Sequence, residues 1–177
     1  MAAPVPSDVA AQVADALAPL RARFESPRWI GPDKLHLTLV FLGGRPADVV
    51  AGCANAMRAA AARHAPIDVA TGEAGGRSGD RRGGVAWLRI EQGSRELSAA
   101  ALDLDGTMGA LSYGERLQPR PHLTVARRVD EPTIAALGEW ASSRPAFTWR
   151  VDRVVLFRSY LGPKGSRYEE LAESRLG

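Results

Sequence analysis

The sequence contains a single cysteine, Cys53, among its 177 residues. One thiol can form neither an internal disulfide framework nor a metal site with several thiolate ligands. No apolar run approaches the roughly 20 residues that a membrane-spanning helix needs, and residues 1–6 lack the charged and apolar regions of a signal peptide. We therefore expect a cytoplasmic protein that does not associate with membranes.

Two further kinds of site have no support in the sequence. No glycine-rich loop that could cradle a nucleoside triphosphate precedes a helical run, and His, Cys and Asp do not cluster at the spacing of metal ligands. We therefore expect no metal and no cofactor. The net charge is only +3, and arginine supplies 21 of the 23 basic residues. We attribute that arginine content to a GC-rich genome in preference to a nucleic-acid partner.

The sequence does contain the tripeptide His-x-Thr, and it contains it twice. The first copy lies in Leu35 to Leu42 and the second in Pro121 to Arg127. Successive side chains of an extended strand alternate between its two faces, so residues two positions apart share one face. Each motif therefore predicts a strand with an imidazole and a hydroxyl on one face and aliphatic side chains packed into a core on the other.

The two motifs belong to a longer internal repeat. His36 and His122 are 86 residues apart, and a proline follows each histidine by ten positions. An amphipathic run precedes each motif, and a helical run follows each proline. A period of this length fits two copies of a half-domain. We predict a single domain over residues 1–177, built from half-repeats 1–84 and 85–177.

Periodicity and turn signals predict the order of the elements. Apolar residues at helical spacing predict helices over residues 7–24, 47–63, 94–111 and 133–142. Extended patterns predict strands over residues 28–30, 35–42, 67–70, 85–90, 121–127, 147–157 and 168–172. The glycine-rich stretch 72–84 predicts a mobile surface loop or a hairpin tip between strands. Only residues 1–6 precede the first helix, so a counterpart of strand 85–90 would be shortened there and would leave a sheet edge exposed.

Paired histidines suit phosphoryl chemistry. On opposite sides of a phosphorus atom they can act as general base and general acid, because imidazole and imidazolium are both populated near neutral pH. Threonine hydroxyls can donate hydrogen bonds to the non-bridging oxygens, where charge concentrates in the transition state. A merely packed or solvated histidine explains one copy of so short a motif, but not two copies in matched surroundings. His64 lacks these surroundings, and we interpret it as a surface residue at a helix end.

The paired motifs resemble the 2H phosphoesterase superfamily, and in particular its bacterial RNA 2′,3′-cyclic phosphodiesterase branch, also called the 2′-5′ RNA ligase family. The segments that carry the resemblance are Lys34 to Gly43, Arg120 to Arg127, and Leu156 to Ser159 with Gly165 and Tyr168. The resemblance implies an α+β fold of two pseudo-symmetric lobes. Each lobe would be an antiparallel sheet backed by helices, with the active site in the central cleft.

The resemblance also implies a reaction. The expected substrate is RNA with a 2′,3′-cyclic phosphate end, tRNA fragments included, and the expected product is a 2′-phosphate formed without a metal. His36 would donate a proton to the leaving oxygen, and His122 would activate water. The phosphate would be held by Thr38, Thr124 and Arg127. The same chemistry run backward would join RNA ends through a 2′-5′ bond. We expect the protein to be a monomer.

Two neighbouring arginines compete for the phosphate contact. The resemblance places it five positions after the second histidine, at Arg127, whereas strict alternation puts Arg128 on the face shared by His122 and Thr124. A strand end or a β-bulge at Ala126 would reconcile the two. We expect Arg127 to be the phosphate ligand.

Two other functions are compatible with the motifs. One is the same chemistry on a small cyclic phosphate nucleotide, and the other is a non-catalytic module that binds RNA ends. Loss of a motif histidine would indicate the binding module, and both histidines are present. Trp29, Phe41 and Tyr160 are candidates for stacking on RNA bases, and a core or rim position is the alternative for each.

Overall fold

The computed structural model of the chain describes residues 1–79, 83–109, 119–162 and 165–177. Within these residues, nine strands form one antiparallel sheet: β1 (Ala2–Pro4), β2 (Arg28–Trp29), β3 (His36–Thr38), β4 (Ile67–Arg77), β5 (Val85–Ile90), β6 (His122–Arg127), β7 (Thr148–Val151), β8 (Arg153–Gly162) and β9 (Gly165–Arg175). Their order is β7-β4-β5-β6-β3-β1-β8-β9, and β2 pairs with β6 outside this order.

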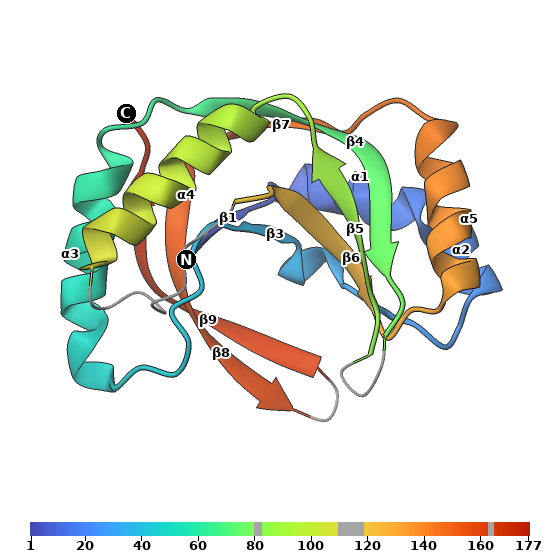
Figure 1. Cartoon of the computed structure of the whole chain (residues 1–177), viewed down its shortest axis with the longest axis horizontal. Coiled ribbons are helices and arrows are strands. Elements are labelled where there is room, and N and C mark those ends of the chain that lie inside the picture. Colours follow the sequence, from blue (N-terminus) through green and yellow to red (C-terminus); the bar gives the residue numbers. More distant parts are fainter. Residues whose placement is uncertain (80–82, 110–118, 163–164) are drawn as a thin grey trace.

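The helices cover the sheet in two groups. They are α1 (Ser7–Ala16), α2 (Ala18–Arg23), α3 (Val50–Ala61), α4 (Ser94–Met108) and α5 (Glu131–Ser142), with 3₁₀ turns η1 (Pro32–Lys34) and η2 (Ala47–Val49). Helices α3 and α4 pack together, with α3 against β8 and β9, while α5 lies against β4 and β5 (Figure 1). Trp140 Nε1 of α5 donates a hydrogen bond to the Ala16 carbonyl of α1 at 3.0 Å. No helix in the described ranges has the length and apolarity needed to cross a membrane.

The strand order is symmetric about the seam between β3 and β6. Moving outward from this seam, β1 and β5 come next, then β8 and β4, then β9 and β7. Strand β4 follows α3 in the chain yet pairs with β5, and β8 follows α5 yet pairs with β1. Each side of the sheet therefore combines strands from both half-repeats. The predicted α+β class with antiparallel pairing is confirmed, and the β3–β6 seam joins both sides into one curled sheet.

The glycine-rich stretch differs from the prediction. Strand β4 continues to Arg77 and pairs with β5, so the loop or hairpin tip predicted over 72–84 is wrong for residues 72–77, and residues 80–82 lie outside the described part of the chain. Glycine is needed here for close packing rather than for a turn. A Cβ atom on Gly75 would come within 2.7 Å of Nε1 of Trp87 on the neighbouring strand.

The first strand is present in a shortened form, as predicted. Strand β1 has three residues, against six in β5. It lies between β3 and β8, so the expectation of an exposed edge is wrong. The first motif strand also ends earlier than predicted, at Thr38. The amides of Leu39 and Val40 both donate to the carbonyl of Met1 instead of continuing the ladder.

The helices begin and end near their predicted positions. The run predicted over 7–24 is broken at Leu17, because Pro19 has no amide hydrogen with which to continue the helix. Helix α5 begins two residues earlier than predicted, where Asp130 caps it by accepting a hydrogen bond from the Thr133 amide at 3.0 Å. The helix predicted over 94–111 runs to Met108, and residues 110–111 lie outside the described part.

The seam is stabilised from the core side by one leucine pair. Leu37 of β3 and Leu123 of β6 are direct cross-strand partners, and only 1% and 0% of their surfaces are exposed. We predict that Leu37→Ala and Leu123→Ala each lower the free energy of unfolding by about 2–5 kcal/mol, the usual cost of truncating a buried leucine. Denaturant titration measures this loss.

The matched control is Leu102→Ala on α4, because Leu102 is 50% exposed. This surface change should alter the free energy of unfolding by no more than about 0.5 kcal/mol. If truncating Leu37 cost no more than truncating Leu102, the seam would not depend on this packing.

Candidate active site

Both motifs meet across the β3–β6 seam. Leu37 pairs with Leu123, and because the strands are antiparallel this register sets His36 beside Thr124 and Thr38 beside His122. Directly opposite residues project from the same face of a sheet. The two leucines occupy the core face, so the two histidines and two threonines share the other face. We call these four residues the motif quartet.

The two imidazoles are oriented in the same way. Nδ1 of His36 lies 2.8 Å from the carbonyl oxygen of Lys34, and Nδ1 of His122 lies 2.8 Å from that of Arg120. A carbonyl oxygen only accepts hydrogen bonds, so each Nδ1 carries the hydrogen. In both rings, Nε2 is the nitrogen that accepts a proton when the imidazole is neutral and donates one when it is charged.

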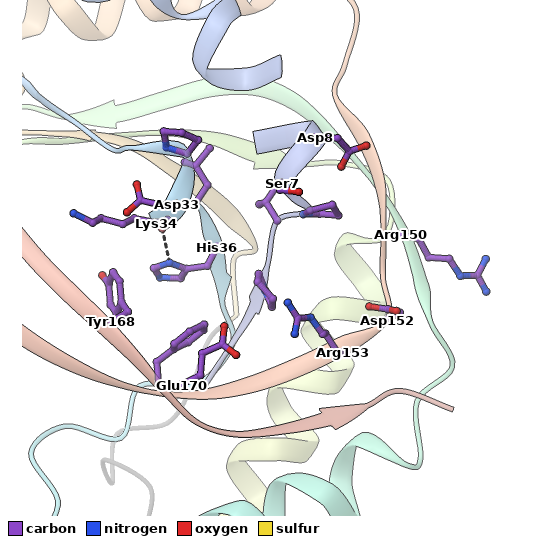
Figure 2. A pocket seen from close by; sticks show the side chains of 16 residues that line it. Ser7, Asp8, Asp33, Lys34, His36, Arg150, Asp152, Arg153, Tyr168 and Glu170 are labelled. Carbon is purple, nitrogen blue, oxygen red and sulfur yellow. Dashed lines mark hydrogen bonds between the residues drawn. The ribbon is translucent and has the colours of Figure 1, made fainter. Parts of the chain in front are cut away.

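His36 lies in a more enclosed position than a strand surface usually offers. Its ring is 5.2 Å from the ring of Tyr168 in an edge-on arrangement and 6.2 Å from that of Phe157, and Figure 2 shows Tyr168 below the imidazole. Burial lowers the pKa of His36 below its ordinary value, and the nearby positive charges of Arg127 and His122 lower it further. The hydrogen bond to the backbone opposes this shift.

A pocket of about 120 Å³ opens on this face of the seam. Its lining contains three members of the motif quartet, His36, Thr38 and Thr124, together with Arg28, Trp29, Ile30, Gly31, Lys34, Arg127, Gly165, Ser166 and Tyr168. Among the residues that the structure describes, no carboxylate lines the pocket, whereas three cationic side chains do. Hydroxyl, imidazole and guanidinium donors that converge in this way favour a tetrahedral anion. His122, the fourth member, does not line this pocket.

Arg127 reaches the pocket because β6 contains a bulge. Residues 86–87 of β5 are adjacent, yet their partners on β6 are Ala126 and Thr124, so Val125 is an extra residue. Val125 and Ala126 are consequently both buried, with 1% and 0% of their surfaces exposed. After the bulge the alternation is shifted by one residue, and Arg127 returns to the face of Thr124.

The backbone of Arg128 has a different conformation from that of Arg127. Its φ is 58°, in the left-handed region, and its amide donates to the carbonyl of Gly84 at 2.7 Å. Of the two arginines that the sequence offered as phosphate ligands, Arg127 is the one that lines the pocket.

Sequence reasoning assigned no role to Arg28, Lys34 or Tyr168, which line the pocket as well. Lys34 precedes His36 by two positions, so the alternation of an extended chain was a usable signal. Arg28 is brought to the pocket because it pairs with Arg127 across β2 and β6. No local pattern predicts that long-range pairing.

The three candidate stacking residues lie in different surroundings. Trp29 lines the pocket, and its Nε1 donates to the carbonyl of Phe24 at 2.9 Å. Phe41 and Tyr160 are 68% and 39% exposed and do not line it. The third histidine, His64, belongs to another region, where its Nε2 lies 2.8 Å from a carboxylate oxygen of Asp103 on α4.

Within the described residues, no three His, Cys, Asp or Glu side chains group closely enough to hold a metal ion. Cys53 is a buried residue of α3.

The sequence profile of the 2′-5′ RNA ligase superfamily matches residues 5–163. The chain belongs to this superfamily. An RNA 2′,3′-cyclic phosphodiesterase of Geobacillus stearothermophilus is 31% identical over 152 residues, which are 81% of this chain and 46% of that protein. The chain therefore spans about half the length of the Geobacillus relative.

Solved structures agree with the superfamily assignment. A protein of Thermus thermophilus superposes with a TM-score of 0.79 at 25% identity, covering 99% of this chain and 95% of that one. LigT of Escherichia coli, crystallised with 3′-AMP, superposes with a TM-score of 0.71 at 25% identity over the same shares of the two chains.

The surroundings of His36 predict the effect of a single substitution. Tyr168→Ala should admit water to the imidazole and raise the pKa of His36 toward the ordinary value of about 6.5, because burial is the largest cause of its lowering. NMR titration of the imidazole proton resonances measures the change.

Tyr160→Ala is the matched control from the same β8–β9 hairpin. Its hydroxyl donates to Glu169 at 2.6 Å, and its ring is outside the pocket, so the pKa of His36 should stay where it is. If both variants shifted the pKa of His36 equally, or if neither shifted it, the inference that Tyr168 shields the imidazole from water would be wrong.

Proposed function

We propose that this protein hydrolyses RNA 2′,3′-cyclic phosphate ends to 2′-phosphomonoesters without a metal ion. His36 is the general acid and His122 the general base, and Thr38, Thr124 and Arg127 bind the phosphate. Membership of the superfamily and the named activity of the Geobacillus relative support a phosphodiesterase. The RNA substrate and the residue roles are our inference from the site.

The observation that carries the proposal is the motif quartet. Across one pair of strands, His36 stands beside Thr124 and Thr38 beside His122. Hydrolysis of a cyclic phosphate needs a proton removed from water on one side of the phosphorus and a proton delivered to the departing O3′ on the other. Two imidazoles whose Nδ1 atoms bond the backbone in the same way can supply both transfers through Nε2, one ring starting neutral and the other protonated.

The phosphate ligands act on charge that grows during the reaction. The threonine hydroxyls donate to the non-bridging oxygens, and the guanidinium of Arg127 offers two parallel N–H donors. Lys34 and Arg28 add positive charge to the same pocket. Donors that are already positioned stabilise the transition state without reorganising.

The bound substrate itself favours protonation of the general acid, His36. In the free protein the pKa of His36 is lowered by burial and by neighbouring cations, so its neutral form is favoured. A bound cyclic phosphate carries a negative charge, which offsets the cations and raises the pKa of His36. Binding of the anion therefore favours the protonated form of His36, which is the form that can donate a proton.

We predict that His36→Ala and His122→Ala each lower the rate of the chemical step by about 10²–10⁴-fold, the usual contribution of one positioned acid or base. The double variant should lose much less than the product of the two single losses, because the residues act as a unit. The assay is single-turnover cleavage, in EDTA, of an oligonucleotide with a 2′,3′-cyclic phosphate end.

His64→Ala is the matched control, since the ring of this histidine contacts Asp103 of α4 and does not line the pocket. It should retain the parent rate. Full activity of His122→Ala in EDTA would refute the acid–base mechanism. A strong preference for a cyclic mononucleotide over the oligonucleotide would assign the enzyme to small nucleotides instead of RNA.

A further inference from the structure

Three cationic side chains line the pocket of about 120 Å³ beside the motif quartet, which we call the central pocket. They are Arg28, Lys34 and Arg127, and no carboxylate of the described residues joins them in the lining. A 2′,3′-cyclic phosphate is a phosphodiester and carries a single negative charge. If Arg127 binds that phosphate, the charges of Arg28 and Lys34 exceed what the reacting group can offset.

The two additional cations lie in different surroundings. Lys34 also lines a larger pocket of about 610 Å³, which contains four carboxylate side chains (Figure 2). These carboxylates can offset the charge of Lys34. Arg28 is not among the residues that line the larger pocket. Arg28 is therefore the better candidate for the ligand of a second anion.

The fold holds Arg28 directly opposite Arg127. The two residues are cross-strand partners on β2 and β6, and opposite residues project from the same face of a sheet with their Cβ atoms about 4.5–5.5 Å apart. Like charges in this arrangement repel each other. Arg28 is half-buried, so water and salt screen that repulsion less than they would between two exposed residues. Anions bound beside both guanidinium groups would remove the repulsion.

The side chain of Arg28 extends toward the β8–β9 hairpin. A Cβ atom on Gly165, the first residue of β9, would lie 3.8 Å from Nη1 and 3.9 Å from Cδ of Arg28. Arg28 therefore reaches from β2 to the edge of the central pocket that β9 forms, whereas Arg127 projects from the seam strand β6. Guanidinium groups that diverge in this way can bind two different phosphates.

The chemistry of the substrate identifies the second phosphate. A volume of about 120 Å³ is below the roughly 300 Å³ at which sites begin to hold whole small ligands, so the central pocket suits phosphate groups and not a nucleoside. A cyclic phosphate closes the 3′ end of its strand. The neighbouring phosphate on the same strand is consequently the internucleotide phosphate on the 5′ side, which a cyclic mononucleotide lacks.

We propose that Arg28 binds the internucleotide phosphate on the 5′ side of the cyclic end, and that this contact makes the enzyme prefer an oligonucleotide to a cyclic mononucleotide. The inference rests on the proposed function and adds a specificity-determining residue to it. No bond to this phosphate forms or breaks. Binding of this remote group holds the cyclic phosphate in position between the two motif histidines.

The test compares three substrates that end in the same cyclic nucleotide. They are the cyclic mononucleotide, a dinucleotide with an ordinary phosphate linkage, and a dinucleotide whose linkage is an uncharged methylphosphonate. The value of kcat/KM is measured for each in EDTA. Ratios between substrates do not depend on how much of the enzyme is folded. The parent should favour the charged dinucleotide over both others by about tenfold or more, the usual effect of a charge-assisted hydrogen bond, and added salt should reduce this preference.

Arg28→Met removes the charge and keeps most of the aliphatic stem. It should lower the ratio of charged dinucleotide to mononucleotide about tenfold or more, and the charged and uncharged linkages should then be hydrolysed almost equally well. Arg28→Lys should restore part of the ratio, because an ammonium group keeps the charge but not the bidentate geometry.

Arg58→Met is the control of equal charge. Arg58 is exposed on α3, where it bonds Asn55, and it does not line the central pocket. The variant should leave the ratio within about twofold, since surface charges far from a site are screened by salt.

The outcomes separate this inference from the function on which it rests. A parent enzyme that hydrolyses all three substrates equally well would overturn the inference alone. The same holds if the parent prefers the uncharged dinucleotide as strongly as the charged one, because base or sugar contacts would then explain the preference. If Arg28→Met slowed all three substrates equally, Arg28 would bind the reacting phosphate, and the inference would be wrong. A parent enzyme that hydrolyses none of them would refute the proposed function, and the inference with it.

Discussion

The candidate site depends on the register of a single pair of strands. Because side chains alternate with a period of two, a slip of one residue between β3 and β6 would move a histidine and a threonine into the core. The pairing of Leu37 with Leu123 prevents that slip, since both leucines are almost fully buried. Hydrophobic packing on one face of the seam therefore determines the geometry of polar groups on the other. The internal repeat supplies two strands that can meet in this way and gives each histidine an equivalent carbonyl partner.

Charged side chains are distributed unevenly around this seam. Among the described residues, the central pocket and the pocket beside His122 are lined by cations without carboxylates, whereas the pocket lined by His36 and Ser7 carries charges of both signs. Burial lowers the pKa of His36 in the free protein, and nearby positive charge lowers it further. Under the proposed function, a bound phosphate offsets that positive charge, so phosphate binding and protonation of His36 are coupled.

Local patterns were sufficient to predict the parts of the site that lie within one strand. Alternation placed His36 with Thr38 and His122 with Thr124, and the repeat indicated that the two pairs belong together. What could not be predicted depends on contacts between distant segments. Arg28 reaches the pocket only through the pairing of β2 with β6, and the β8–β9 hairpin brings Tyr168 to His36 only because strands are exchanged between the half-repeats. The glycines of β4 were wrongly interpreted as part of a loop, because Gly75 accommodates the neighbouring indole of Trp87 instead of forming a turn.

The most direct test of the central claim, that both motif histidines act on one phosphorus, is nitrogen NMR of the imidazoles with and without a nucleoside 2′-monophosphate. This ligand is the product of the proposed reaction and carries the phosphate that the motif quartet would bind. The account predicts that binding moves the Nε2 resonances of His36 and His122 together, because each nitrogen then contacts a phosphate oxygen, and leaves His64 unchanged. A response from only one motif histidine, or an equal response from His64, would contradict the account.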